Sequence, residues 1–174
     1  MFVLEFIAKL IKILRSEISP NQISWGFVLG MIIGLTPIMS LHNLFVVFLI
    51  IILKVNLATA IFSFGIFSGI AYLVDPLFHS FGFYILVDIQ GLNGFWTWLY
   101  NVPVLALSKF NNTVVMGSLV SSLILMLPVY FLIKIGVVNY REKIDVKVKN
   151  WKFIKYIKAT KIYSIYEKIR DLGV

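Results

Sequence analysis

The stretch SPNQISWGFVLGMIIGLTPIMSLHNLFVVFLIIILKVN, residues 19–56, contains two apolar runs separated by a short polar break. A helix that crosses a membrane needs about 20 residues to pass about 30 Å of hydrocarbon. The positions between Pro20 and Lys54 are too few for two crossings and too apolar for a loop. We therefore predict a helical hairpin over residues 20–54 that enters a membrane and returns to the same side. Irregular backbone at such depth must pack inside protein or line a wet cavity, so this hairpin requires neighbours.

The composition of the chain indicates an integral membrane protein. Hydrophobic residues occupy 60% of the 174 positions and charged residues 14%. A soluble domain has about 45–50% apolar and about 25% charged residues. The absence of cysteine excludes disulfides and thiolate metal sites. We expect an all-α membrane protein without a metal or another cofactor.

The two ends of the chain have helical patterns of a different kind. Residues 1–18 predict an amphipathic helix that lies in the membrane interface; the alternative is a helix packed on a protein partner. Residues 139–174 predict a cytoplasmic basic amphipathic tail on anionic headgroups, because residues 140–174 hold 10 of the 16 lysines and arginines. Its interleaved aromatics also occur in RNA-binding segments. We favour lipid because the tail borders an apolar span, and we expect no nucleic-acid partner.

The two halves of the chain repeat one another. A shift of 56 residues aligns Pro20/Pro76, Ser24/Ser80, Gly26/Gly82 and Phe27/Phe83, and a shift of 55 aligns Lys54/Lys109, Asn56/Asn111 and Ser63/Ser118. The order and spacing of these identities indicate an internal repeat.

The repeat predicts a topology. Repeat 1, residues 19–74, contains the hairpin 20–54 and a transmembrane helix 55–74. Repeat 2, residues 75–138, contains a re-entrant hairpin 76–107 and a transmembrane helix 112–135. One crossing per repeat inverts the second repeat, an arrangement typical of transporters. Lysine and arginine placement then puts both termini in the cytoplasm.

Two further expectations follow from this topology. The tips at Pro37 and at residues 91–94 should approach each other inside the membrane. Trp96, Trp98 and Tyr100 should anchor the chain at the outer interface.

Glycines and charges suggest how the hairpins are held. Gly26, Gly30 and Gly34 form a stripe that allows close helix packing, with a glycine-lined substrate path or a partner contact as alternatives. Charged residues bracket each hairpin, and we expect structural ion pairs between them: Glu17 with Lys54, and Asp75 with Lys109. The alternative is that each lysine snorkels independently.

Polar residues inside apolar segments are the candidate site residues. His42 and Asn43 near the first tip, and Asp88 and Asn93 near the second, are the candidates for lipid contact. The alternative role of His42 is to satisfy the broken backbone.

Other polar residues are given structural roles, and no enzymatic activity is expected. His79 is expected to bond Asp75, and Asn56 and Asn111 to cap the following helices. The chain has no HExxH, GxSxG or phosphate-loop motif.

Several motifs resemble one known family: SPNQISWGFVLGMIIGLTP, LHNL, KVNLATA, DPLFHSFG, LYNVPV and FNNTVVMGSLV. They resemble small bacterial inner-membrane proteins grouped as domain of unknown function 2062. The resemblance implies the bacterial inner membrane, and a complex with a larger single-span envelope protein encoded nearby. The predicted paired hairpins are similar in architecture alone to the DedA or VTT lipid-scrambling proteins.

Two function classes fit these observations. The first is phospholipid transport or scrambling, with lipid handed to an envelope partner, because scarce buried charge suits an amphiphile better than an ion. The second is a non-transporting structural or assembly subunit that anchors a partner helix through the glycine stripe.

Overall fold

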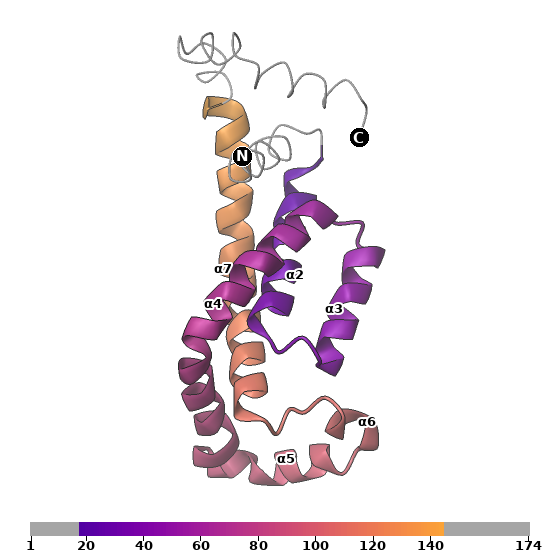
Figure 1. The fold of residues 1–174 in the computed structure, drawn as a ribbon, viewed down its shortest axis with the longest axis vertical. Coiled ribbons are helices and arrows are strands. Elements are labelled where there is room, and N and C mark those ends of the chain that lie inside the picture. The colour runs from indigo at the N-terminus through magenta and orange to yellow at the C-terminus, as the bar shows by residue number, and fades with distance from the viewer. Residues whose placement is uncertain (1–17, 145–174) are drawn as a thin grey trace. The chain divides into compact units, whose positions relative to one another are not determined.

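The computed structural model describes residues 18–144, which are almost entirely helical and contain no strand. Residues 18–134 form one compact unit. The predicted interfacial helix and most of the predicted basic tail lie outside the described residues. The elements in chain order are α2 (Pro20–Leu35), α3 (Leu41–Ile52), α4 (Leu57–Phe83), a π-helical turn (Tyr84–Asp88), a 3-10 turn (Gln90–Leu92), α5 (Asn93–Tyr100), α6 (Pro103–Ala106), α7 (Thr113–Asn139) and a second π-helical turn (Tyr140–Ile144) (Figure 1).

Two helical segments are long and apolar enough to cross a membrane. They are Leu57–Asp88 and Thr113–Glu142. α2 and α3 form the helical hairpin that the apolar runs predict. Their 16 and 12 residues correspond to about 24 and about 18 Å at 1.5 Å per residue. Each is therefore shorter than the hydrocarbon thickness of about 30 Å.

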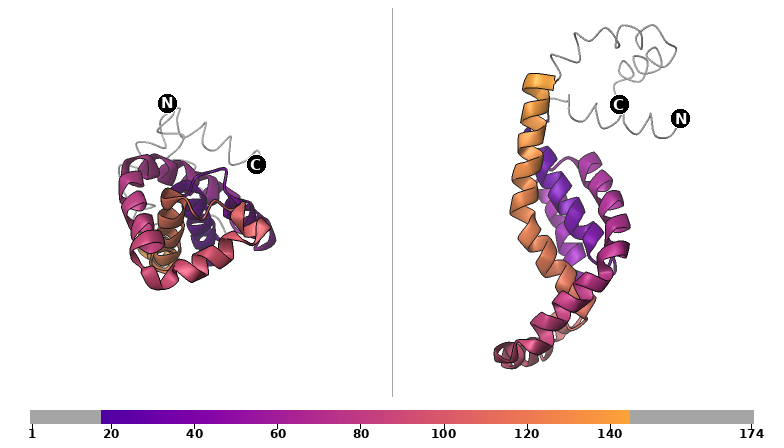
Figure 2. Two further views of the ribbon diagram at one scale, coloured as in Figure 1. Left: turned by 90° about the horizontal axis from the view of Figure 1, so that it is seen from below. Right: turned by 90° about the vertical axis from the view of Figure 1, so that its left-hand side faces the viewer.

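α2 is the central helix of the compact unit (Figure 1, Figure 2). It starts with a capping box, in which the Ser19 side chain accepts a hydrogen bond from the Gln22 N–H and the Gln22 side chain accepts one from the Ser19 N–H. It ends at Leu35, because Pro37 disfavours helical backbone at Thr36. Ten of its 16 residues are buried. A helix that is apolar on every side is expected in such a position.

The glycine stripe of α2 packs directly on the backbone of α4. A Cβ atom added at Gly26 or Gly30 would overlap the backbone carbonyl of Asn56 or Ala60, respectively. At Gly34 such an atom would lie 2.8 Å from the carbonyl oxygen of Phe64. Each step of four residues along α2 matches a step of four residues in the same direction along α4. The two helices therefore run parallel. The stripe is filled by α4, and it neither lines an open path nor remains free for a partner.

Side chains of α3 and α7 close the other sides of α2. One buried cluster joins Val28, Leu29 and Ile32 of α2 to Val46 of α3 and Tyr130 of α7. The Tyr130 hydroxyl also donates to the Asn21 side chain at 2.9 Å. This bond brings the later part of α7 to the end of the hairpin where α2 begins.

Gln22 ties the two ends of the hairpin together at its base. Its Nε2 donates to the Lys54 carbonyl at 3.1 Å. The backbone carbonyl of Gln22 accepts a hydrogen bond from the Asn56 N–H at 3.1 Å. Asn56 then caps α4, with its Oδ1 2.7 Å from the Thr59 nitrogen. The predicted cap at Asn56 is confirmed.

The second half of the chain departs from the predicted repeat. α4 does not end before Asp75 but continues through Pro76 to Phe83, so residues 76–83 extend α4 instead of opening a second hairpin. Gly82 packs on the Thr113 carbonyl and Gly117 on the Phe78 carbonyl. The earlier residue on α4 meets the later residue on α7, so this part of α4 is antiparallel to α7. By contrast, α2 is parallel to α4.

Local features of the repeat nevertheless recur. The Ser24 hydroxyl donates to the Pro20 carbonyl at 2.8 Å, and the Ser80 hydroxyl to the Pro76 carbonyl at 3.0 Å. Lys54 and Lys109 have positive φ angles of 49° and 58°, the two such cases among described residues other than glycine. The repeated residues therefore form similar local structures in the two halves, although the helices of the two halves follow different courses.

Two of the three predicted polar contacts need correction. No ion pair joins Asp75 to Lys109 within residues 18–144, and Glu17, the predicted partner of Lys54, lies outside them. The His79 Nδ1 lies 2.6 Å from the Thr113 Oγ1, so its partner is not Asp75.

The cap at the start of α7 also differs from the prediction. Asn112, rather than Asn111, caps this helix. Its Oδ1 lies 2.9 Å from the nitrogen of Val114 and 3.2 Å from that of Val115.

The glycine crossing yields a stability prediction. Gly30→Ala should lower the unfolding free energy in detergent by more than about 2 kcal/mol, because backbone on both helices must move to admit the methyl group. Gly65→Ala is the matched control on α4, where an added Cβ meets no atom within 4 Å. The control should be neutral or stabilise by about 0.5–1 kcal/mol. Equal losses in thermal or denaturant unfolding of both variants would contradict the crossing.

Candidate functional site

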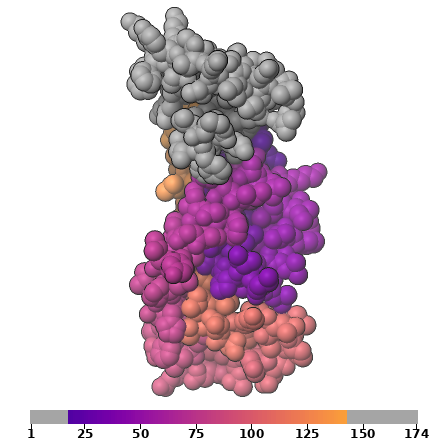
Figure 3. All heavy atoms as spheres, viewed as in Figure 1, coloured from indigo at the N-terminus to yellow at the C-terminus, as the bar shows by residue number. Residues whose placement is uncertain are grey.

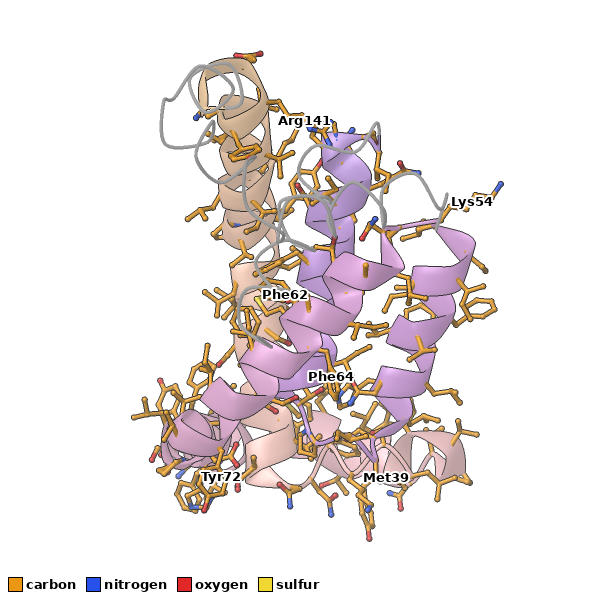
Figure 4. All side chains as sticks on the ribbon, turned by 45° about the horizontal axis from the view of Figure 1, so that its top comes forward. Met39, Lys54, Phe62, Phe64, Tyr72 and Arg141 are labelled. Carbon is orange, nitrogen blue, oxygen red and sulfur yellow. The ribbon has the colours of Figure 1, made fainter. Side chains whose placement is uncertain are left out.

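The candidate site is the hairpin tip, residues 36–43, where α2 turns into α3. Thr36, Ser40 and Asn43 are buried here, with exposed fractions of 3%, 8% and 4%. Such polar burial is costly unless each group is hydrogen-bonded. Figure 4 shows Met39 at this end of the hairpin and Lys54 at the other.

Asn43 holds the turn together. Its Oδ1 accepts from the Thr36 hydroxyl at 2.9 Å. Its Nδ2 lies 3.0 Å from the Pro37 carbonyl and 3.4 Å from that of Ile38. The Thr36 Oγ1 also lies 2.8 Å from the Ile32 carbonyl, an acceptor at the end of α2. One buried amide thus bridges both helices and the turn between them.

The tip lies beside the middle of α4. An added Cβ at Gly34 would be 2.8 Å from the Phe67 Cβ and 3.1 Å from the Ser68 nitrogen. Phe64 and Ser68 follow Leu57, the start of α4, by 7 and 11 residues. At 1.5 Å per residue these positions are about 10 and about 16 Å along α4. The polar turn is therefore far from the start of α4.

Two buried polar atoms in this region have no hydrogen-bond partner among the described residues. They are the Nε2 of His42, in the first turn of α3, and the hydroxyl of Ser68, in the part of α4 that packs on Gly34. Most buried polar atoms in proteins are paired, and an unpaired one calls for an explanation. The desolvation cost of each atom would be recovered by a ligand that bonds it.

The start of α3 adds further hydrogen-bond donors without a side-chain partner. Ser40 is its N-cap residue but makes no side-chain cap bond, because its hydroxyl donates instead to the Pro37 carbonyl at 2.5 Å. The N-terminus of a helix carries a partial positive charge and free N–H groups. The α3 start and His42 therefore offer donors of the kind that bind phosphate or carboxylate, and the Ser68 hydroxyl is a further unpaired donor on α4.

The other candidate lipid-binding residues are elsewhere. Asp88 is exposed at the end of the π-helical turn, and Asn93 is exposed at the start of α5. In the described part of the chain no hydrogen bond joins either residue to His42 or Asn43. A Cβ added at Gly91 or Gly94 meets no other atom within 4 Å, so neither glycine is packed against Pro37 on its Cβ side. The structure does not bring the four candidates into one site.

Two site residues were absent from the sequence prediction. Thr36 directly precedes Pro37, a position that ends helices, and this was the available signal for its capping role. Ser68 lies in the interior of an apolar helix, and sequence alone gave no signal for it because serine is common in membrane helices.

The outward surface of α3 is apolar and exposed. It forms an open depression of about 590 Å³ lined by Leu41, Leu44, Phe45, Val47, Phe48 and Ile51. Figure 3 shows this side of α3 uncovered by the other described segments. The polar tip therefore lies at the end of an apolar surface suited to hydrocarbon chains.

Comparison with known proteins assigns the chain to a family. Residues 5–144 match the family described as "Uncharacterized protein conserved in bacteria (DUF2062)", and the chain belongs to it. The resemblance noted in the sequence is thus confirmed. The chain is also 24% identical over 139 residues to a protein of Treponema pallidum (strain Nichols) described as "Uncharacterized protein", covering 80% of this chain and 85% of that relative. No solved structure matches the chain.

The bond between Thr36 and Asn43 can be tested with a double-mutant cycle. Thr36→Val and Asn43→Ala should each lower the unfolding free energy by about 1–3 kcal/mol, because Thr36→Val leaves the Asn43 Oδ1 unpaired and Asn43→Ala removes the bonds that its amide makes to Thr36 and to the Pro37 carbonyl. The double variant should lose less than the sum, since the two residues share one bond. Thr97→Val is the control, an exposed hydroxyl that bonds the carbonyl four residues earlier. It should change stability by less than about 0.5 kcal/mol. Additive losses would argue against the shared bond.

Proposed function

We propose that this member of the DUF2062 family moves phospholipid between the leaflets of the bacterial inner membrane, with the hairpin tip as a polar station for the headgroup. The observation that supports the proposal is the unpaired His42 Nε2 and Ser68 hydroxyl in a buried polar region beside the middle of α4. A site of this kind is more costly to maintain than an apolar one, so it calls for a ligand.

The proposal addresses the main barrier to lipid movement. A charged phosphate in hydrocarbon costs many kcal/mol unless it is hydrogen-bonded. Half-helix N-termini inside transporters bind anionic substrate groups by their dipole and free N–H groups. At the tip, the start of α3 would act in this way, and His42 and Ser68 would add side-chain donors. The acyl chains would remain against the apolar outer surface of α3, lined by residues such as Phe45 and Phe48.

The membrane placement is part of the proposal. If α4 enters the membrane near Leu57, the tip lies about 10–16 Å along α4, which is near the middle of about 30 Å of hydrocarbon. The bond between Tyr130 and Asn21 supports a common side for the start of α2 and the later part of α7. Lys54 and Lys134 would then mark the cytoplasmic side, and both termini would be cytoplasmic.

A second candidate is a structural subunit that anchors the helix of a larger single-span envelope partner. The stripe at Gly26, Gly30 and Gly34 cannot serve this role because α4 fills it. Gly65 and Gly69 have open space beside them at the same four-residue spacing, which suits a docked membrane helix. The two candidates are compatible if the protein passes lipid to that partner.

A vesicle assay tests the transport proposal. Purified protein is reconstituted with a fluorescent phospholipid, and dithionite is added to bleach only the dye on the outer leaflet. Full bleaching would indicate that lipid crosses between leaflets. His42→Phe should slow the crossing by about tenfold or more, since a hydrogen bond to a charged group contributes about 1.5–3 kcal/mol.

Stability measurements separate a ligand role from a structural one. His42→Phe and Ser68→Ala should leave the melting temperature unchanged or raise it, because each removes an unpaired buried polar atom. Ser122→Ala is the control: its buried hydroxyl is already paired with the Leu119 carbonyl at 2.8 Å, and the variant should retain wild-type crossing rates. If the wild-type protein moves no lipid and forms a stable stoichiometric complex with a single-span envelope partner, the structural-subunit role is favoured.

A further inference from the structure

The segment that contains α5 and α6 lies at the ends of both candidate spans. It follows the π-helical turn that ends the Leu57–Asp88 span and precedes Thr113, where the next span begins. α5 runs across the direction of α7 (Figure 1, Figure 2). This position is where a membrane boundary must pass if the two helices cross.

Two sides of α5 already have defined surroundings. Asn93, Thr97 and Asn101 form an exposed polar row, in which the Thr97 hydroxyl donates to the Asn93 carbonyl at 2.8 Å and the Asn101 amide to the Thr97 carbonyl at 3.0 Å. On another side the Trp96 Nε1 donates to the Ile85 carbonyl at 3.3 Å, and its ring packs on Phe110 with centroids 6.1 Å apart. This second side attaches α5 to the rest of the unit.

The third side of α5 is apolar and uncovered. Phe95 and Trp98 have exposed fractions of 49% and 61%, and their ring centroids are 6.1 Å apart. On α6 and just after it, Val104 and Leu107 are 63% and 72% exposed. We call Phe95, Trp98, Val104 and Leu107 the aromatic-aliphatic face.

The charge of the segment is compatible with a phosphate layer. Residues 89–112 contain one charged side chain, Lys109. Lys109 is exposed, in the turn before α7. A lysine at the end of a span extends its ammonium group to the headgroup phosphates.

We propose that residues 93–107 lie flat in the outer interface of the membrane, with the aromatic-aliphatic face in contact with lipid. The inference rests on the proposed crossing of the membrane by α4 and α7. Lipid is favoured as the occupant because the segment joins the ends of two apolar helices that are long enough to cross a membrane. Tryptophan and tyrosine gather at this level of membrane proteins, and short amphipathic helices lie in the interface in the same way. The polar row then faces water.

Single cysteines provide a direct test because the chain has none of its own. Phe95→Cys and Leu107→Cys report on the aromatic-aliphatic face, and Thr97→Cys and Asn101→Cys on the polar row. Each full-length variant is treated with a water-soluble maleimide in intact membranes and again after solubilisation in denaturing detergent. Alkylation needs the thiolate, which apolar surroundings disfavour, so Phe95→Cys and Leu107→Cys should react at least about tenfold more slowly than the polar-row variants in membranes. All four should react alike in denaturing detergent.

A control on α7 separates failure of this inference from failure of the membrane placement. Ile124 is 62% exposed in the interior of the second span, and Ile124→Cys should resist the reagent in membranes. If Ile124→Cys is protected but Phe95→Cys and Leu107→Cys react as fast as Thr97→Cys, the interfacial inference is wrong and the proposed crossing stands. Rapid labelling of Ile124→Cys would overturn both. Protection of all four segment cysteines would also overturn the inference, since the polar row would then be covered. Should Phe95→Cys not accumulate, Val104→Cys replaces it on the same face.

Discussion

The rest of the structure depends on the direct contact between the backbones of α2 and α4 at Gly26, Gly30 and Gly34. Lipid offers helices no hydrophobic driving force for association, so they associate through close packing and hydrogen bonds. Side chains at these positions would separate the helices, and the Ser63 hydroxyl could not reach the Phe27 carbonyl at 2.6 Å. The same contact fixes how far the hairpin extends along α4. The depth of the polar tip is therefore a consequence of glycine packing.

Once the tip is held there, its buried backbone groups must be hydrogen-bonded within the protein itself, since an unpaired buried polar group is costly. Asn43 does this at the tip, and Gln22 does it at the base. The polar groups of the hairpin thus divide into two sets. One set is paired and structural, and the other, the Nε2 of His42, is unpaired, as is the Ser68 hydroxyl on α4. Only the second set has capacity for a ligand, which is why the functional proposal rests on it.

The length of the apolar runs was sufficient to predict the first hairpin, and the spacing of its glycines predicted the close packing. His42 and Asn43 were identifiable because polar side chains stand out in an apolar run. The partner of the glycine stripe and the pairing of Asn43 with Thr36 depend on tertiary geometry that no local pattern contains. The sequence repeat was a weaker guide. Its aligned residues do make matching local bonds, such as that from the Ser80 hydroxyl to the Pro76 carbonyl, but the inverted topology that it predicted for the second half is wrong.

The reason for this asymmetry lies in the cost of ending a helix and leaving its last backbone groups without partners. Proline within a helix costs about 3 kcal/mol or more through one lost hydrogen bond and a steric clash. Ending α4 at Asp75 and turning back would leave up to four carbonyls and four N–H groups without helical partners, and each such group costs about 1–3 kcal/mol where it is buried and unpaired. Continuing through Pro76 therefore costs less. The first hairpin can turn back because Thr36, Ser40 and Asn43 supply hydrogen bonds to its turn, and residues 74–76 contain no comparable group of amide and hydroxyl side chains.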